Sequence, residues 1–88
     1  MSDWRVYILL CSDGSFYTGI TTDVERRLRE HNHSKLGARY TRSRRPVKLV
    51  FQEKCLDRSD AGKAEYRIRK LTRTEKQKMV KDYKARKD

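Results

Sequence analysis

The stretch Ser15–His31, SFYTGITTDVERRLREH, changes from a strand pattern to a helix pattern within a few residues. Its first six residues are rich in aromatic and β-branched types, which favour extended structure. Further on, Val24, Leu28 and His31 recur at helical spacing. We therefore predict a strand that leads directly into a basic helix at about residues 23 to 32.

The preceding segment, WRVYILLC (4–11), predicts a strand that pairs with this one. It is apolar and β-rich, and the turn residues SDG separate it from the stretch above, a pattern typical of a hairpin. Tyr7 and Tyr17 lie on the two strands of this hairpin, so both phenols can reach one patch of sheet surface. Packing is the usual role of aromatic strand residues, and it is the alternative to a functional role here.

The segment VKLVFQEKC (47–55) predicts a third strand. We expect Val47, Leu49 and Phe51 to share one face. Val50 breaks strict alternation, as a residue does in a strand that is covered on both sides.

Two Thr-x-x-Glu pairs predict capping boxes at helix starts. Thr22 and Glu25 precede the first helix, and Thr72 and Glu75 precede the last one. We expect the last helix to end near Tyr83. The residues that follow it are too polar to pack against a core.

A further helix lies between them, with Asp57 or Ser59 as its cap. The order β-β-α-β-α-α predicts an α+β fold, a small three-stranded antiparallel or mixed sheet flanked by helices. We expect one domain over residues 1–88, with a core at about 4–71 and a C-terminal helix at about 73–85. The inward stripe of the middle helix comprises Ala61, Ala64, Ile68 and Leu71.

The composition points to a polyanionic partner. Twenty-three Lys and Arg against twelve Asp and Glu give a net charge of +11, and the pI is about 10.1. Such a charge steers a protein toward nucleic acid, and binding releases counterions that had been condensed on the nucleic acid. DNA is the expected partner and RNA remains an alternative. A ribosome-associated or merely soluble basic protein is the alternative that size and charge alone allow.

Several classes of protein are disfavoured by what the sequence lacks. It has no apolar run of about 20 residues and no secretory leader, so we expect a cytoplasmic protein, with association with the nucleoid left open. It has no glycine-rich phosphate-binding loop, so we expect no nucleotide cofactor. Cys11 and Cys55 lack metal-site or disulfide spacing, and we expect buried thiols at strand ends. We expect a monomer or weak dimer.

Three helical residues are candidates for a site. Arg27 and His31 are four residues apart and so share a helix face, where they can converge on one anion. Exposed surface positions are the alternative. Glu65 borders the apolar stripe of its helix, which suits either an ion pair with a nearby arginine or a ligand for Mg²⁺ or Mn²⁺.

The segment HSKLGARYTRSRRP (33–46) has no periodicity and predicts an exposed basic loop. Tyr40 within it either stacks on a base or packs. Gly19, in the strand before the first helix, lets the backbone turn and approach nucleic acid closely. The loop cations expected to contact backbone phosphates are Lys35, Arg39, Arg42, Arg44 and Arg45.

Over residues 4–71 the ordered set of motifs resembles the GIY-YIG nuclease superfamily, above all its small single-domain bacterial members. Arg5-Val6-Tyr7 stands where the first signature would be, and Tyr17-Thr18-Gly19 where the second would be. The order continues with Arg27, His31 and Glu65. The glycine of the first signature is Arg5 here, Thr18 replaces the second isoleucine, and no asparagine follows Glu65.

The resemblance implies a metal-dependent endonuclease acting on DNA, on branched, nicked or damaged structures, with a role in DNA repair. It implies that Glu65 holds one Mg²⁺ or Mn²⁺ and that Arg27 grips the scissile phosphate. Tyr7 is the first choice for general base, and Tyr17 is able to exchange roles with it. His31 would orient a phenol, accept a relayed proton or hydrogen-bond the phosphate. The alternative is a module that binds nucleic acid without cutting it.

Overall fold

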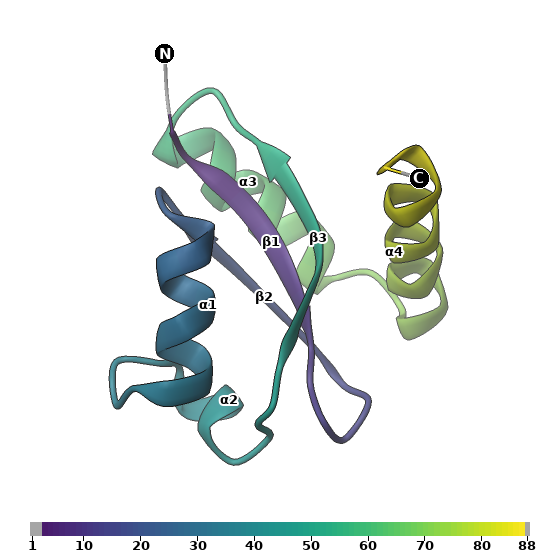
Figure 1. The fold of residues 1–88 in the computed structure, drawn as a ribbon. Coiled ribbons are helices and arrows are strands. Elements are labelled where there is room, and N and C mark those ends of the chain that lie inside the picture. Colours follow the sequence, from purple (N-terminus) through teal and green to yellow (C-terminus); the bar gives the residue numbers. More distant parts are fainter. Residues whose placement is uncertain (1–2, 88) are drawn as a thin grey trace.

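Residues 3–87 are described by the structure, a computed structural model, and they form a sheet with helices on both faces. In Figure 1, α1 lies on the near side of the sheet, α3 lies behind it, and α4 stands beside β3. The elements are β1 (Arg5–Leu10), β2 (Phe16–Thr21), α1 (Val24–His33), α2 (Arg39–Arg42), β3 (Lys48–Lys54), α3 (Arg58–Arg69) and α4 (Arg73–Lys87).

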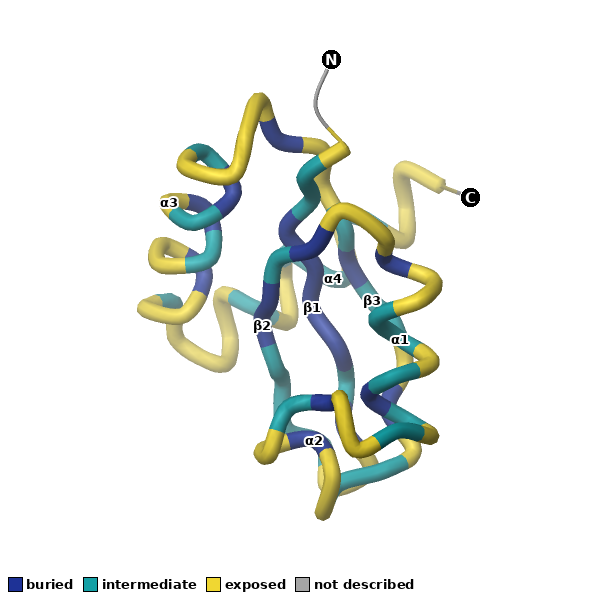
Figure 2. The backbone as a smooth tube through the Cα atoms, turned by 90° about the vertical axis from the view of Figure 1, so that its left-hand side faces the viewer, coloured by how far each residue is buried: buried dark blue, intermediate teal, exposed yellow. Residues whose placement is uncertain are grey.

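The strand order is β2-β1-β3, and both pairings are antiparallel. The predicted α+β fold with a three-stranded sheet is confirmed, and its strands are antiparallel throughout. The hairpin pairs Tyr7 with Gly19 and Ile8 with Thr18. Because β1 is central, β2 and β3 are the edges. Figure 2 looks onto the β2 edge, with α3 on one side, α1 on the other and α2 below.

The prediction that Val47, Leu49 and Phe51 share one face of β3 is wrong. Ile8 pairs with Phe51 while the next residue, Leu9, pairs with Leu49, so the register shifts by one residue at Val50. This extra residue is a β-bulge, and it reverses the alternation beyond it. Phe51 and Val50 therefore pack toward α3, while Val47 and Leu49 pack on the other face.

Each sheet face has its own buried cluster. On the α3 side, Val6, Ile8 and Phe51 meet three members of the predicted helix stripe, Ala61, Ala64 and Ile68, all buried. The fourth, Leu71, lies beyond the end of α3 at Arg69 and is half-buried. The other face, toward α1, contains Tyr7, Leu9, Cys11 and Val47. Both cysteines are buried free thiols directly after strands, as predicted.

Helix starts follow the predicted chemistry in two cases of three. Asp57 caps α3 by accepting from the Asp60 backbone N–H at 2.7 Å. Thr72 and Glu75 form the predicted reciprocal capping box. The box at Thr22 is wrong, since Asp23 is the cap of α1 and its carboxylate accepts from the Arg26 N–H at 3.0 Å. A carboxylate nearer the helix start serves the same orphan N–H groups.

The predicted basic loop is partly helical, which corrects its assignment as an exposed loop. Helix α2 lies within it, and Thr41 of α2 is fully buried. The last helix runs to Lys87, beyond the predicted end near Tyr83, and only Tyr83 of its final residues packs on the core, 5.3 Å from Phe51 between ring centroids. Within residues 3–87 no helix is long and apolar enough to cross a membrane.

Candidate active site

Tyr7 is the centre of the site, and Gly19 makes room for it. The two residues are partners across β1 and β2. A Cβ atom at residue 19 would lie 2.5 Å from the Tyr7 hydroxyl oxygen and 2.6 Å from Cζ, closer than nonbonded atoms approach. The phenol therefore lies across the glycine backbone. Gly19 is inside β2, so the expectation that it bends the chain out of the strand is corrected: its missing side chain is space for Tyr7.

A buried hydrogen-bond chain starts at this phenol. The Tyr7 hydroxyl lies 2.9 Å from Nε2 of His31, and Nδ1 of His31 lies 2.8 Å from Oγ1 of Thr41. The Thr41 hydroxyl donates to the Ala38 carbonyl at 2.9 Å, which leaves its oxygen to accept from His31 Nδ1–H at 2.8 Å. The Ala38 N–H also faces Nδ1, but at the longer distance of 3.4 Å, so the shorter contact decides the tautomer. This assigns Nε2 as the acceptor of the Tyr7 O–H proton. Tyr7 is 2% exposed, and His31 and Thr41 are 0% exposed.

Burial sets the protonation states along this chain. It lowers the pKa of His31 to about 4, and the nearby Arg27 guanidinium adds to the effect. Burial also raises the pKa of Tyr7 to about 12, assisted by Tyr17 and Glu65 and opposed by Arg27. At neutral pH the chain therefore consists of a neutral phenol, a neutral imidazole and a hydroxyl. With both ring nitrogens engaged, His31 has no donor left for a phosphate.

Tyr17 lies beside this chain at the outer strand. Its ring centroid is 5.2 Å from that of His31 in an edge-on arrangement and 6.0 Å from that of Tyr40 in a stacked one. It lines a hollow of about 280 Å³ along β2 together with Tyr40. Tyr40 is 39% exposed, and the Arg44 guanidinium lies 3.9 Å from its ring centroid, so packing accounts for much of its ring.

Arg27 projects from α1 toward the same phenol. Its Nη1 donates to Oε1 of Glu30 at 2.9 Å and to the Leu36 carbonyl at 2.6 Å. Its side chain is 25% exposed, and its charge acts on both Tyr7 and His31. A fixed, partly exposed guanidinium next to a phenol is suited to hold a phosphate oxygen.

Glu65 approaches from α3, on the other side of the β2 edge. Its carboxylate is 25% exposed, lies 3.9 Å from Arg69 and acts on the pKa of Tyr7. No group of three or more His, Cys, Asp or Glu side chains gathers in the described residues. One carboxylate does fit Mg²⁺, because this ion keeps several waters and takes further ligands from substrate phosphates.

The predicted phosphate contacts divide into two groups. Lys35, Arg39 and Arg42 are exposed side chains. Arg44 pairs with Asp13 at 3.0 Å. Arg45 donates to the backbone carbonyls of Glu30, His31 and Ser34, so it holds the C-terminal end of α1. These contacts give Arg44 and Arg45 a structural role. Lys35, Arg39 and Arg42 remain the cations whose charge is available for phosphate groups.

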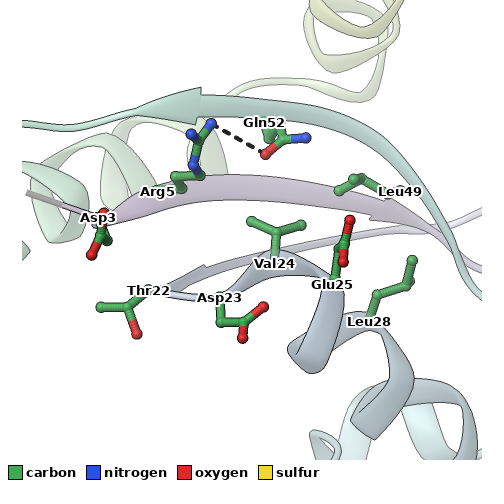
Figure 3. Close-up of a pocket in the computed structure, with 9 residues that line it drawn as sticks. All are labelled: Asp3, Arg5, Thr22, Asp23, Val24, Glu25, Leu28, Leu49 and Gln52. Atoms are coloured by element: carbon green, nitrogen blue, oxygen red, sulfur yellow. Dashed lines mark hydrogen bonds between the residues drawn. The ribbon is translucent and has the colours of Figure 1, made fainter.

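A second hollow, of about 380 Å³, lies at the start of α1 (Figure 3). None of the predicted site residues lines it. Three of its lining residues are acidic, Asp3, Asp23 and Glu25, against one arginine, Arg5, which Figure 3 shows bonded to Gln52. Its charge repels a polyanion, so of these two hollows the smaller one at β2 suits nucleic acid better.

Sequence patterns missed three parts of this arrangement. Thr41 gave no signal because it lies among cations in a segment without periodicity. Arg69 and Lys76, which line the β2 hollow, lie on helices whose cations carry no positional information until α3 and α4 are placed. The contact between Tyr7 and Gly19 becomes visible only once the register of the hairpin is known.

Comparison with known proteins identifies relatives along most of the chain. The model of the GIY-YIG catalytic domain matches residues 3–79. A UPF0213 protein of Desulfotalea psychrophila is 60% identical over 78 residues, covering 89% of this chain and 71% of the relative. A UPF0213 protein of Halobacterium salinarum is 51% identical over 73 residues, covering 83% and 94%.

Solved structures agree with the fold. The chain is similar to the solution NMR structure of protein EF2693 from E. faecalis, with 51% identity, a TM-score of 0.61 and coverage of 92% of this chain and 85% of that one. It is also similar to the solution NMR structure of the UPF0213 protein BH0048 from Bacillus halodurans, with 45% identity, a TM-score of 0.56 and coverage of 89% and 82%.

Proposed function

This chain belongs to the GIY-YIG catalytic domain family, and from that premise we propose that it is a metal-dependent endonuclease that hydrolyses phosphodiester bonds in DNA. One observation supports the proposal above the others. The Tyr7 hydroxyl of β1 lies 2.9 Å from Nε2 of His31, and side chains from three other elements, Tyr17 of β2, Arg27 of α1 and Glu65 of α3, lie near enough to shift its pKa. Together they bring a proton acceptor, a cation and a carboxylate to one place.

Arg27 binds the scissile phosphate in this proposal. Its guanidinium offers charge-assisted hydrogen bonds to the non-bridging oxygens, whose negative charge grows as water attacks. The bound anion also offsets the Arg27 charge, which is one cause of the low pKa of His31. Substrate binding thereby makes His31 a better proton acceptor at the moment when one is required.

Tyr7 moves the proton. An isolated phenol with a pKa of about 12 is almost never ionised at neutral pH, so it cannot act as a base by itself. It does so by relay: its oxygen takes a proton from the attacking water while its own proton passes to Nε2 of His31. Thr41 holds the imidazole through Nδ1, which keeps Nε2 directed at the phenol. His31 is thus the proton acceptor of the relay and Thr41 is a positioning residue, and we propose that Tyr17, whose ring centroid lies 5.2 Å from that of His31, is able to exchange roles with Tyr7.

Glu65 would hold one Mg²⁺ or Mn²⁺ beside the phosphate, and that ion would stabilise charge on the leaving 3′ oxygen when bound. The carboxylate lies 3.9 Å from the exposed Arg69, a distance at which a surface ion pair is weak and readily exchanged.

Selection of substrate by structure is also part of the proposal. The exposed cations near the site, Lys35, Arg39 and Arg42, are suited to contact backbone phosphates, which carry no sequence information. Branched, nicked or damaged DNA would then be chosen by its shape.

Cleavage of a labelled panel tests the proposal. Duplex, single-stranded, flap, fork and nicked DNA and their RNA counterparts are incubated with Mg²⁺, Mn²⁺ or EDTA. We expect metal-dependent cutting of DNA by the wild type, abolished by Glu65→Gln and by Arg27→Gln.

Two matched variants serve as controls. Glu25→Gln removes an acid from the other hollow, and Arg26→Gln removes the exposed arginine next to Arg27. Both should cut like the wild type. Absence of cutting in every condition, or cutting that survives Glu65→Gln, would contradict the nuclease proposal and favour a module that only binds nucleic acid.

A further inference from the structure

Three cations outside the predicted basic segment lie beside the open edge of β2. Arg69 is in the last turn of α3, and Arg73 and Lys76 are in the first turns of α4. Arg69 and Lys76 line the same hollow as Tyr17. The Arg73 guanidinium lies 5.4 Å from the ring centroid of Phe16, which also lines that hollow. The chain therefore brings the junction of α3 and α4 to the end of β2 that carries Tyr17.

The positive charge of this cluster is poorly compensated. Arg69 has one ion pair, with Glu65, at 3.9 Å. Neither Arg73 nor Lys76 has an ion-pair partner in the part of the chain that the structure describes. Glu75, the acid nearest to them in sequence, is held by the Thr72 backbone N–H in the capping box. The cluster therefore keeps most of its positive charge beside the hollow that Tyr17 lines.

The opposite wall of the hollow belongs to α2. Tyr40 lines it, and Arg39 and Arg42 are exposed on the same short helix. Between the two walls runs β2, whose outer edge pairs with no strand within residues 3–87. Figure 2 shows this edge with α2 below it and α3 at its side. The hollow is thus lined by the aromatic residues Phe16, Tyr17 and Tyr40 and by the cations Arg69 and Lys76, and α2, which contributes Tyr40, carries two more exposed cations.

We propose that Arg69, Arg73 and Lys76 form a second phosphate-binding wall, so that a nucleic-acid strand crosses the edge of β2 between this wall and α2. The inference rests on the proposed function and extends it, because it assigns the path of the substrate. Arg69 lies next to Glu65, so the phosphate that it contacts is adjacent to the one that is cut. The α2 cations contact the strand on the other side of the cut.

Binding in EDTA tests the wall without cleavage. The affinity for a fluorescein-labelled DNA duplex is measured against salt concentration for wild type and for the triple variant Arg69→Gln/Arg73→Gln/Lys76→Gln. The slope of log K against log salt changes by about 0.9 for each phosphate contact on a duplex, so the triple variant should have a shallower slope by about 2 to 3.

A second triple variant controls for net charge. Arg67, Lys84 and Lys87 line hollows on the β3 side of the same two helices, so Arg67→Gln/Lys84→Gln/Lys87→Gln removes three charges far from the β2 edge. It should keep the wild-type slope. Equal slopes of log K against log salt in the two triple variants would contradict the proposed phosphate-binding wall, whether or not the protein cuts DNA.

The cleavage panel separates this inference from the proposed function. Cutting that depends on Glu65, together with equal slopes, would leave the nuclease in place and contradict only the substrate path. A shallower slope in the first triple variant, with no cutting by the wild type, would support the wall and contradict the nuclease. The circular dichroism spectra of all variants should match that of the wild type, since five of the six altered side chains are exposed and Lys76 is half-buried.

Discussion

The two faces of the sheet bury different chemistry. The face toward α3 is closed by aliphatic and aromatic groups such as Val6, Ile8 and Phe51. The face toward α1 buries a chain of three polar side chains, Tyr7, His31 and Thr41. Burying a polar group costs free energy unless it is hydrogen-bonded, and an apolar core would have been simpler to build. We infer from this difference that the buried side chains of the α1 face serve the proposed reaction, whereas those of the α3 face serve the stability of the fold.

The largest effect should come from adding one methyl group on the polar face. In Gly19→Ala the new Cβ would collide with the Tyr7 ring and push the phenol away from His31. A displacement of about 1 Å can cost about 100-fold in rate, and we expect at least that loss of DNA cleavage. Overpacking should also lower the free energy of unfolding by about 1–3 kcal/mol.

Gly62→Ala is the matched control on α3. A Cβ there would meet no atom within 4 Å, and alanine favours helix by about 0.5–1 kcal/mol. We expect full cleavage and slightly higher stability, measured by urea denaturation. Equal cleavage rates for the two alanine variants would show that the Tyr7 position is not critical.

The second largest effect is the dependence of stability on pH, which we expect from the buried His31 of the α1 face. His31 has a pKa of about 4 in the fold and 6.5 in the unfolded chain, so below pH 6.5 the unfolded chain binds more protons. Stability contributed by neutral His31 is therefore present above about pH 6.5 and is lost as the pH falls toward 4. The loss is on the order of 3 kcal/mol.

Urea denaturation between pH 4 and pH 7 measures this loss. His31→Gln should flatten the pH dependence, while His33→Gln, at an exposed position of the same helix, should keep it. The same pH dependence in all three proteins would mean that His31 is not held neutral by burial.

The smallest effect compares two buried threonines on opposite faces. Thr41→Val removes the hydroxyl that joins His31 to Ala38 and should cost about 1–2 kcal/mol of stability. Thr18 is paired with Ile8 and makes no side-chain hydrogen bond within residues 3–87, so Thr18→Val should be nearly neutral. A larger loss of stability in Thr18→Val than in Thr41→Val would contradict the account that the buried hydrogen bonds lie on the α1 face.

The α3 face could be predicted from the sequence because its elements are determined by residues that are close together in the chain. The stripe Ala61, Ala64 and Ile68, the cap Asp57 and the box at Thr72 each follow from short-range patterns of apolarity and hydrogen bonding. Even here the bulge at Val50 escaped prediction, because register depends on the partner strand rather than on the strand itself.

The α1 face could be predicted only as a set of candidates. Tyr7, Tyr17, Arg27 and His31, together with Glu65 from α3, were identified as candidates from spacing and resemblance, and whether they come together depends on the long-range placement of four elements. The role of Gly19, to leave space for Tyr7, became clear only from the pairing of β1 with β2. The contact of Thr41 with His31 could not be predicted, because Thr41 lies in a segment whose sequence has no periodicity. Buried polar side chains that contact one another across different elements follow no regular spacing in the sequence. They can therefore be recognised only from the three-dimensional structure.

The most direct test of the central claim is the protonation of His31, followed by ¹⁵N NMR of its imidazole from pH 3.5 to 8. The claim is that His31 is a neutral acceptor for the Tyr7 proton, held in place by Thr41. We predict a proton on Nδ1, none on Nε2, and a midpoint near pH 4. A proton on Nε2, or a midpoint near pH 6.5, would contradict the relay from Tyr7 and with it the proposed mechanism.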